Sequence, residues 1–149
     1  MGIISDAHQS KTDAGPYTNG VKHLAAALES LNKLDVKEIV SCGDSCANDG
    51  TKDEWEAYLN TIEQSPFSRS QIHECNGNHD GDASKNLTLF KQYANNGTRA
   101  GNTPYFSIDL YGDHFIFMAL DQNTKPSGSE VFSDAQMEWL EKEIQHYYN

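Results

Sequence analysis

The strongest constraint on the fold is an order that repeats through the first half of the chain. A short apolar run leads into a polar motif, and an amphipathic segment follows. The apolar runs end at Ile4, Cys42 and Cys75, and the segments between them carry apolar residues at helical spacing over 21–31 and 55–62. This alternation of strand and helix signals predicts a parallel sheet with right-handed helical crossovers.

The second half of the chain shows a different pattern. The β-rich runs 105–111 and 114–120 flank the dipeptide Gly112-Asp113, which predicts a β-hairpin with a two-residue turn. An amphipathic helix follows, and Ser133 is placed to cap it. Because the hairpin adds antiparallel strands to the parallel ones, we expect an α/β fold with a mixed sheet or sandwich.

Composition sets limits on the partners of the chain. The 149 residues include 22 acidic and 11 basic ones, for a formal net charge of −11. General nucleic-acid and anionic-membrane surfaces need clustered Lys and Arg, so we expect neither kind of partner. We find no apolar run of membrane-spanning length and no signal peptide, and we expect one domain over 1–149 with a cytoplasmic location by default. The compartment itself stays open.

The chain has three cysteines, which is a small and odd number and does not indicate a disulfide framework. Cys42 and Cys75 each end an apparent strand, where cysteine is more often a small buried hydrophobe, so we expect both to be buried. Cys42 and Cys46 bracket Asp44 at a spacing that thiolate metal ligands also use. For Cys46 both interpretations stay open.

Three polar motifs each follow a predicted strand at its carboxyl end, which is the edge where open α/β sheets bind ligands. They are Asp6-Ala7-His8, Gly43-Asp44 and Gly77-Asn78-His79-Asp80. The carboxylates of Asp6 and Asp44 and the imidazole of His8 are suitable ligands for Mn, Fe, Zn, Co or Ni. The amide oxygen of Asn78 is a further candidate. The sequence therefore predicts a metal site at this edge of the sheet.

The spacing within these motifs also indicates roles. A carboxylate on a tight turn, as expected for Asp44, can offer one oxygen to each of two ions. Two ions about 3.5–4 Å apart would hold a hydroxide and clamp phosphoryl oxygens during an in-line displacement. Since His79 follows Asn78 directly, we expect its ring to reach the leaving-group oxygen instead of the same metal. We expect Asp80 to orient that imidazole.

Taken in this order, the motifs resemble those of the calcineurin-like metallophosphoesterase superfamily, whose members carry D-x-H, then G-D, then G-N-H-D/E. The likeness continues through 115–121, which is similar to the family's strand ending in Leu-Asp. The segment 135–141 is similar to its Q-x-x-W-L-E helix. The resemblance implies a four-layer α/β/β/α sandwich and two divalent transition metal ions.

The resemblance also implies an activity and a role for each motif residue. The implied metal ligands are Asp6, His8, Asp44 and Asn78, with Asp44 shared by both ions, and the implied catalytic residues are His79 and Asp80. The expected activity is hydrolysis of small phosphomonoesters or phosphodiesters by a hydroxide held between the two metals. The alternative is a degenerate, non-catalytic metal-binding or interaction module on the same scaffold.

Family members take further metal ligands from a later strand and from a G-H-x-H motif, which we do not find after 135–141. We therefore expect the chain to be the amino-terminal part of the domain, with an incomplete sandwich and fewer ions bound, or none. An open sheet edge would favour self-association. The other histidines are expected to be structural or surface residues: His23, His73, His114 and His146.

Overall fold

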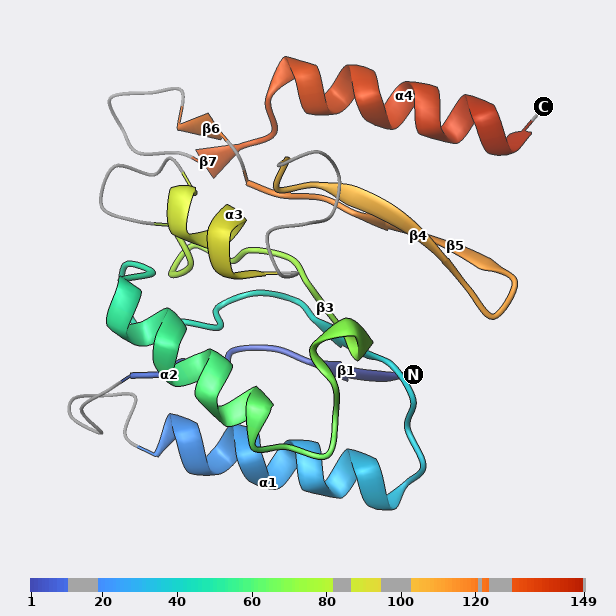
Figure 1. The fold of residues 1–149 in the computed structure, drawn as a ribbon. Helices are drawn as coiled ribbons and strands as arrows, with labels where there is room; N and C mark the ends of the chain where they lie inside the picture. Colours follow the sequence, from blue (N-terminus) through green and yellow to red (C-terminus); the bar gives the residue numbers. More distant parts are fainter. Residues whose placement is uncertain (11–18, 82–86, 95–102, 121, 124–129, 149) are drawn as a thin grey trace.

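The computed structural model describes residues 1–10, 19–81, 87–94, 103–120, 122–123 and 130–148 (Figure 1). The fold is mixed α/β, with a three-stranded parallel sheet and two small antiparallel pairs of strands. In chain order the elements are β1 (Gly2–Ile4), α1 (Gly20–Lys33), β2 (Ile39–Ser41), α2 (Lys52–Glu63), the 3-10 turn η1 (Arg69–Gln71), β3 (Ile72–Glu74), α3 (Thr88–Tyr93), β4 (Phe106–Leu110), β5 (Asp113–Phe117), β6 (Gln122–Asn123), β7 (Glu130–Val131) and α4 (Asp134–Tyr148).

The parallel sheet confirms the prediction made from the repeated strand and helix signals. β2 lies in the centre and pairs in parallel with β1 on one side and β3 on the other. Ile4 is opposite Ser41 and Ser41 is opposite Glu74, so the three strands end level. Because they end level, the three loops that carry the polar motifs leave the sheet at one edge.

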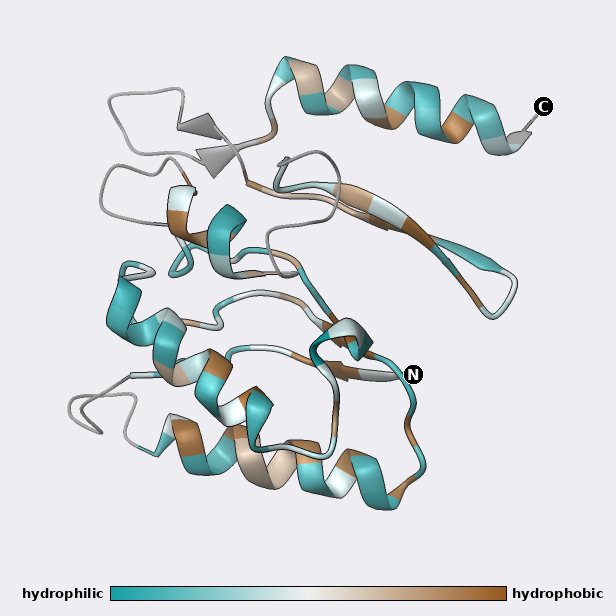
Figure 2. Cartoon of the chain, viewed as in Figure 1, coloured by the Kyte–Doolittle hydropathy of each residue, from teal (hydrophilic) through white to brown (hydrophobic). Residues whose placement is uncertain are grey.

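Helices α1 and α2 cover one face of this sheet, and their apolar residues recur at helical spacing (Figure 2). The buried cluster on this face includes Leu24, Leu28, Ile39, Trp55, Tyr58, Ile62, Ile72 and Phe90. α2 begins at a capping box, in which the N–H of Glu54 donates to Oγ1 of Thr51 and the N–H of Thr51 donates to the Glu54 carboxylate. The two helices thus pack against the sheet that carries the motif loops.

The β4–β5 hairpin packs on the opposite face of the sheet. Val40 of β2 joins Phe106 and Phe117 of the hairpin in a second buried cluster. The rings of Phe106 and Phe117 stack with their centroids 4.4 Å apart. α4 lies on the far side of the hairpin, where Trp139 packs against Tyr105 (Figure 1). The described elements therefore lie in the order α1 and α2, parallel sheet, hairpin, α4.

Two buried amide side chains join these layers through the segment that follows β5. The N–H of Leu120 donates to Oδ1 of Asn76 (3.0 Å), which lies in the loop after β3. Gln136 of α4 accepts from the N–H of Ala119 (2.8 Å) and donates to its carbonyl (2.7 Å). The backbone of Ala119 is therefore hydrogen-bonded to α4, and the backbone of the next residue, Leu120, is hydrogen-bonded to the loop after β3. The N–H groups of Ala119 and Leu120 and both amide side chains therefore have hydrogen-bond partners.

The hairpin turn differs from the prediction by one residue. Leu110 pairs with Asp113, so the turn consists of Tyr111 and Gly112 and not of Gly112-Asp113. Tyr111 has a φ of 56° and Gly112 a φ of 91°. A type I′ turn needs positive φ at both central positions, and its twist matches that of the flanking strands. Because a type I′ turn matches the twist of β4 and β5, we attribute the observed strand register to it, although Tyr111 then has a left-handed backbone conformation.

None of the helices in the described part of the chain has the length and apolarity needed to cross a bilayer. α4 carries an outer face with exposed apolar side chains, including Met137 at 46% and Ile144 at 41%. Self-association through such surfaces stays a prediction.

Candidate metal centre

The loops that follow β1 and β2 run side by side. The N–H of Asp6 donates to the carbonyl of Gly43 (3.0 Å), and the N–H of His8 donates to the carbonyl of Asp44 (2.9 Å). These hydrogen bonds continue the pairing of β1 with β2 beyond the last strand residues. The first two motifs are therefore held in register by backbone contacts, whatever their side chains bind.

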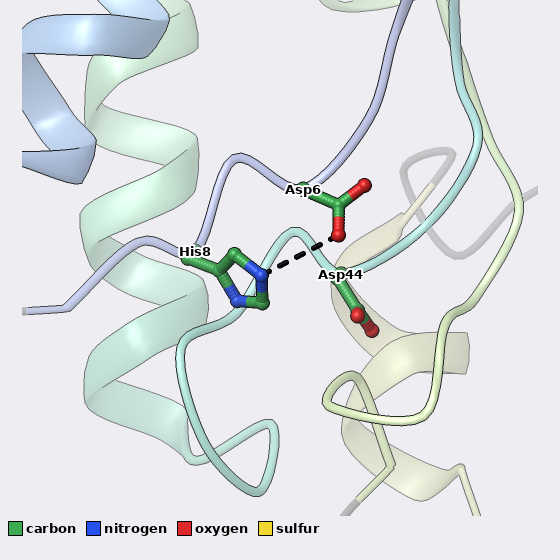
Figure 3. A group of neighbouring side chains, drawn as sticks. All are labelled: Asp6, His8 and Asp44. Carbon is green, nitrogen blue, oxygen red and sulfur yellow. Dashed lines mark ion pairs between the residues drawn. The ribbon is translucent and has the colours of Figure 1, made fainter. Parts of the chain in front are cut away.

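The side chains of Asp6, His8 and Asp44 converge at this edge (Figure 3). One ligand atom from each, two carboxylate oxygens and an imidazole nitrogen, lies within 4.8 Å of the others. Nε2 of His8 is 3.5 Å from Oδ1 of Asp6. Of the histidines, cysteines and acids that the structure describes, only these three form such a group. Two carboxylates and an imidazole are the donor chemistry of a borderline divalent cation, so the residues fit the predicted ion.

A backbone carbonyl orients the His8 ring. Nδ1 of His8 lies 3.2 Å from the carbonyl oxygen of Cys46. A proton on Nδ1 that is donated to this carbonyl makes Nε2 the basic nitrogen, and Nε2 is the atom beside Asp6. Metal-binding histidines are commonly held by such a contact to their other ring nitrogen, which fixes both tautomer and orientation.

All three candidate ligands have left-handed backbone conformations. The φ angles are 55° for Asp6, 44° for His8 and 52° for Asp44. This region costs an L-residue on the order of 1–2 kcal/mol, although Asp and His adopt it more readily than most residues. Strained backbone of this kind clusters at ligand sites, where the surrounding contacts enforce it. The chain therefore gives up some stability to place these three side chains.

The loop after β3 packs directly against Asp44. The N–H of His79 donates to Oδ1 of Asp44 (2.9 Å). Gly77 lies so close that a Cβ at this position would be 2.5 Å from the backbone nitrogen of Asp44, and closer still to its Oδ1. Asn78 lies between these two contacts, and its side chain is exposed. The third motif thus reaches the predicted edge, and a ligand role for Asn78 stays a prediction.

His79 lies beside the cluster, but its partner differs from the expected one. Its ring is edge-on to that of His8, with centroids 5.2 Å apart. Nδ1 of His79 lies 2.9 Å from the carbonyl oxygen of Asn48, so this carbonyl, and not Asp80, orients the imidazole. The turn between Gly77 and Asp80 sends the side chain of Asp80 into the interior, while that of His79 stays half-exposed.

Asp80 holds two loops together through backbone groups. It is fully buried, and its two oxygens accept from the N–H of Cys46 (2.9 Å) and the N–H of Gly77 (2.8 Å). Burial raises the pKa of Asp80 to about 7, although hydrogen bonds from the backbone of Gly77, Cys46 and Asp44 act in the opposite direction. Since Cys46 orients His8 and Gly77 contacts Asp44, this carboxylate helps to position two of the candidate ligands.

Replacing Asp80 with Ala is expected to lower the free energy of unfolding by about 2 kcal/mol. The N–H groups of Cys46 and Gly77 lose their acceptor, and removal of the buried carboxylate offsets only part of that cost. Urea denaturation measures the change. The matched control is Asp113→Ala at an exposed hairpin position, where we expect a change within about 0.5 kcal/mol. An Asp80→Ala chain as stable as the wild type would contradict the proposal that Asp80 holds the two loops together.

The cysteines also differ from the expectation. Cys46 is completely buried, whereas Cys42 is exposed and Cys75 is half-buried. The physical reason is that β2 and β3 end at Ser41 and Glu74, one residue earlier than predicted. Cys42 therefore lies just after the last residue of β2, at the start of the loop that carries Asp44.

Two of the remaining histidines form contacts within the fold. Nε2 of His73 lies 2.8 Å from a carboxylate oxygen of Glu38. The ring of His114 lies between Asp109 (2.8 Å) and Glu143 (3.1 Å), and so connects the hairpin with α4. These contacts agree with the structural roles expected for both residues.

Comparison with known proteins adds no assignment. No protein-family model matches the sequence, and no curated protein matches it. The functional interpretation therefore depends on the motifs and on the geometry described above.

Proposed function

We propose that Asp6, His8 and Asp44 bind a divalent cation, and that the chain uses it to hydrolyse phosphomonoesters or phosphodiesters. The observation that carries this proposal is the convergence of the three ligand atoms within 4.8 Å of one another. Their donor chemistry favours Mn, Fe, Zn, Co or Ni. The reaction class comes from the order of the three motifs, which resembles that of calcineurin-like metallophosphoesterases.

The arrangement of the layers is consistent with the proposed family relationship. Helices α1 and α2, the parallel sheet, the hairpin and α4 follow one another in the order of an α/β/β/α sandwich. The segment similar to the family's Q-x-x-W-L-E helix lies in α4. Its Trp139 packs against Tyr105 beside the hairpin, and its Gln136 is hydrogen-bonded to the segment after β5. We propose that the described elements are the amino-terminal part of such a sandwich.

The proposed roles follow from the contacts of each side chain. Asp6 and His8 would hold the first ion together with Asp44. The loop that carries Asn78 packs against Asp44, and a second ion would take these two residues as ligands. A bound divalent cation supplies Lewis acidity, which polarises a phosphoryl oxygen and makes water a better nucleophile at neutral pH.

His79 is proposed as the proton donor to the leaving group. The Asn48 carbonyl holds its Nδ1, so Nε2 is the ring atom that would carry the proton to be transferred. Asp80 has a positioning role in this proposal, because its contacts run to the backbone of the loops that carry the ligands.

Charge gives a further reason to expect a cation at this edge. A phosphoester is an anion, and the chain has a formal net charge of −11. Two carboxylates in the cluster would repel such a substrate. A cation between them reverses the local sign, so substrate binding is expected to depend on the metal.

The proposal is tested by measuring metal binding and hydrolysis on the same metal-free chain. We expect saturable Mn²⁺ binding by calorimetry, together with Mn²⁺-dependent release of nitrophenolate from bis(4-nitrophenyl) phosphate or 4-nitrophenyl phosphate that a chelator stops. Saturable binding without turnover would favour the second candidate function, a non-catalytic metal-binding module. That candidate is supported by the size of the cluster, which brings together three ligand residues within the described ranges. Absence of binding would exclude both functions.

A further inference from the structure

Two cysteines lie opposite each other at the ends of neighbouring strands, immediately before the metal loops. Ser41 of β2 is opposite Glu74 of β3, so the next pair in this register is Cys42 and Cys75. The N–H of Cys75 donates to the carbonyl of Ser41 (2.9 Å), which shows that the ladder continues past the last assigned pair. The two cysteines are therefore cross-strand neighbours.

Both side chains lie on the face of the sheet that the hairpin covers. Side chains alternate along a strand, so Cys42 shares a face with Val40, and Cys75 shares a face with His73. Val40 packs in the cluster that contains Phe117, and the ring of His73 lies 6.1 Å from that of Phe117. Cys75 packs against the same cluster. The thiols thus point to one side of the sheet.

The spacing and the exposure of this pair suit disulfide exchange. Neighbouring strands lie about 4.8 Å apart, and a disulfide needs Cα atoms roughly 4.4–6.8 Å apart. Cys42 is exposed to reagents, while Cys75 is half-buried beside it. Burial, with the neighbouring Cys42 thiol as the next cause, raises the pKa of Cys75 to about 12. Cys42 is accordingly the thiol that an external disulfide reaches first.

We propose that Cys42 and Cys75 form a redox-active pair, which a low-molecular-weight disulfide converts to a cross-strand disulfide that weakens cation binding at Asp6, His8 and Asp44. The existence of the pair is independent of any metal. The effect on the cation rests on the proposed function.

The exchange takes place in two steps and needs one molecule of oxidant. The Cys42 sulfur loses its proton and attacks one sulfur of the external disulfide, forming a mixed disulfide and releasing one thiol. The Cys75 sulfur then loses its proton and attacks the Cys42 sulfur, and the second external thiol leaves. Overall, two protein thiols are oxidised to one disulfide, and the external disulfide is reduced to two thiols.

The bond would act on the metal site because the adjoining residues have no spare room. A disulfide draws its Cβ atoms to about 3.8 Å, which is closer than the roughly 4.8 Å between neighbouring strands, so the backbone at Cys42 and Cys75 has to rotate or shift to bring the two Cβ atoms together. Gly43, directly after Cys42, already lies so close to the third loop that a Cβ there would be 2.5 Å from the nitrogen of Gly77. A backbone shift at Cys42 therefore moves Gly43 against that loop and displaces Asp44 relative to it.

The first experiment identifies the bond. The full chain is incubated with oxidised glutathione, unreacted thiols are alkylated, and proteolytic fragments are mapped by mass spectrometry. We expect a Cys42–Cys75 cross-link with Cys46 alkylated only after denaturation. The variant Cys75→Ser should stop at a mixed disulfide on Cys42, and Cys42→Ser should form no intramolecular disulfide. A wild-type chain that also stops at the mixed disulfide, or that keeps all its thiols, would overturn the proposal.

The second experiment measures the coupling to the cation. Mn²⁺ affinity is compared between reduced and oxidised wild-type chain, with the double variant Cys42→Ser, Cys75→Ser treated in the same way as the control. We expect about tenfold weaker binding after oxidation, full recovery with a thiol reductant, and no effect of oxidant on the double variant. Equal affinities in the two redox states would refute the coupling. If the reduced chain binds no Mn²⁺, the proposed function fails, while the peptide map still decides whether the cysteine pair exists.

Discussion

Asp44→Asn is expected to lower Mn²⁺ affinity, and any metal-dependent phosphodiester hydrolysis, by more than about 100-fold. Changes in the residues that merely support a metal ligand typically cost 10–100-fold, so loss of a ligand should cost more. Asp44 is the ligand that connects the first two loops with the third, because its Oδ1 also accepts from the N–H of His79. Its neutral replacement removes the negative charge that both proposed ions share.

The substitution is chosen to leave the fold intact. Asn keeps an oxygen in the Oδ1 position, so the hydrogen bond from the His79 N–H is retained, and the volume of the side chain hardly changes. The matched control is Asp113→Asn in the hairpin, which makes the same charge change at an exposed site. Calorimetric titration with Mn²⁺ and release of nitrophenolate measure the outcome. Unchanged turnover in Asp44→Asn would rule out the bridging role.

Gly77→Ala is expected to disrupt the site from the backbone. A Cβ at this position would be 2.5 Å from the nitrogen of Asp44 and would overlap its carboxylate, so Asp44 has to move. We expect Mn²⁺ affinity to fall by more than about 100-fold, as for loss of the ligand itself. We also expect the free energy of unfolding to fall by about 3 kcal/mol, because the overlap lies between two hydrogen-bonded loops that cannot easily separate.

Gly112→Ala provides the control for this second prediction. Gly112 has a φ of 91° at the hairpin turn, and a Cβ there would have open space within 4 Å. It therefore tests the cost of an unfavourable conformation without any steric overlap, which we expect to be about 1 kcal/mol with no change in Mn²⁺ affinity. Chemical denaturation and calorimetry are run on both variants. If Gly77→Ala bound Mn²⁺ as the wild type does, the close approach of the two loops would not be needed for the site.

The parallel sheet and the location of the site were predictable because both depend on local patterns. Apolar runs and helical stripes identify strands and helices, and level parallel strands necessarily release their loops at one edge. Asp6, His8 and Asp44 therefore could be placed together before any coordinates were known. The third motif could be placed beside them for the same reason.

The contacts that support the site were not predictable, because they involve backbone groups. Any residue has a carbonyl, so no sequence signal marks Cys46 as the partner of His8 or Asn48 as the partner of His79. Asp80 was expected to orient the imidazole of His79 because the two residues are adjacent in the sequence. In the structure its buried carboxylate accepts instead from backbone N–H groups of two loops. Strand ends and turn register are likewise decided by tertiary packing and twist, which explains the errors at Cys42 and the hairpin turn.

The left-handed backbone at Asp6, His8 and Asp44 has a consequence for engineering. Glycine would adopt these conformations with little strain, so a library screened only for heat tolerance should enrich glycine at all three positions. The gain at each position is at most about 1 kcal/mol, because glycine also has more conformational freedom to lose on folding. Such a screen would select a more stable protein that lacks the carboxylate and imidazole ligands needed to bind a cation. Directed evolution of this chain should therefore keep metal affinity among its selection criteria.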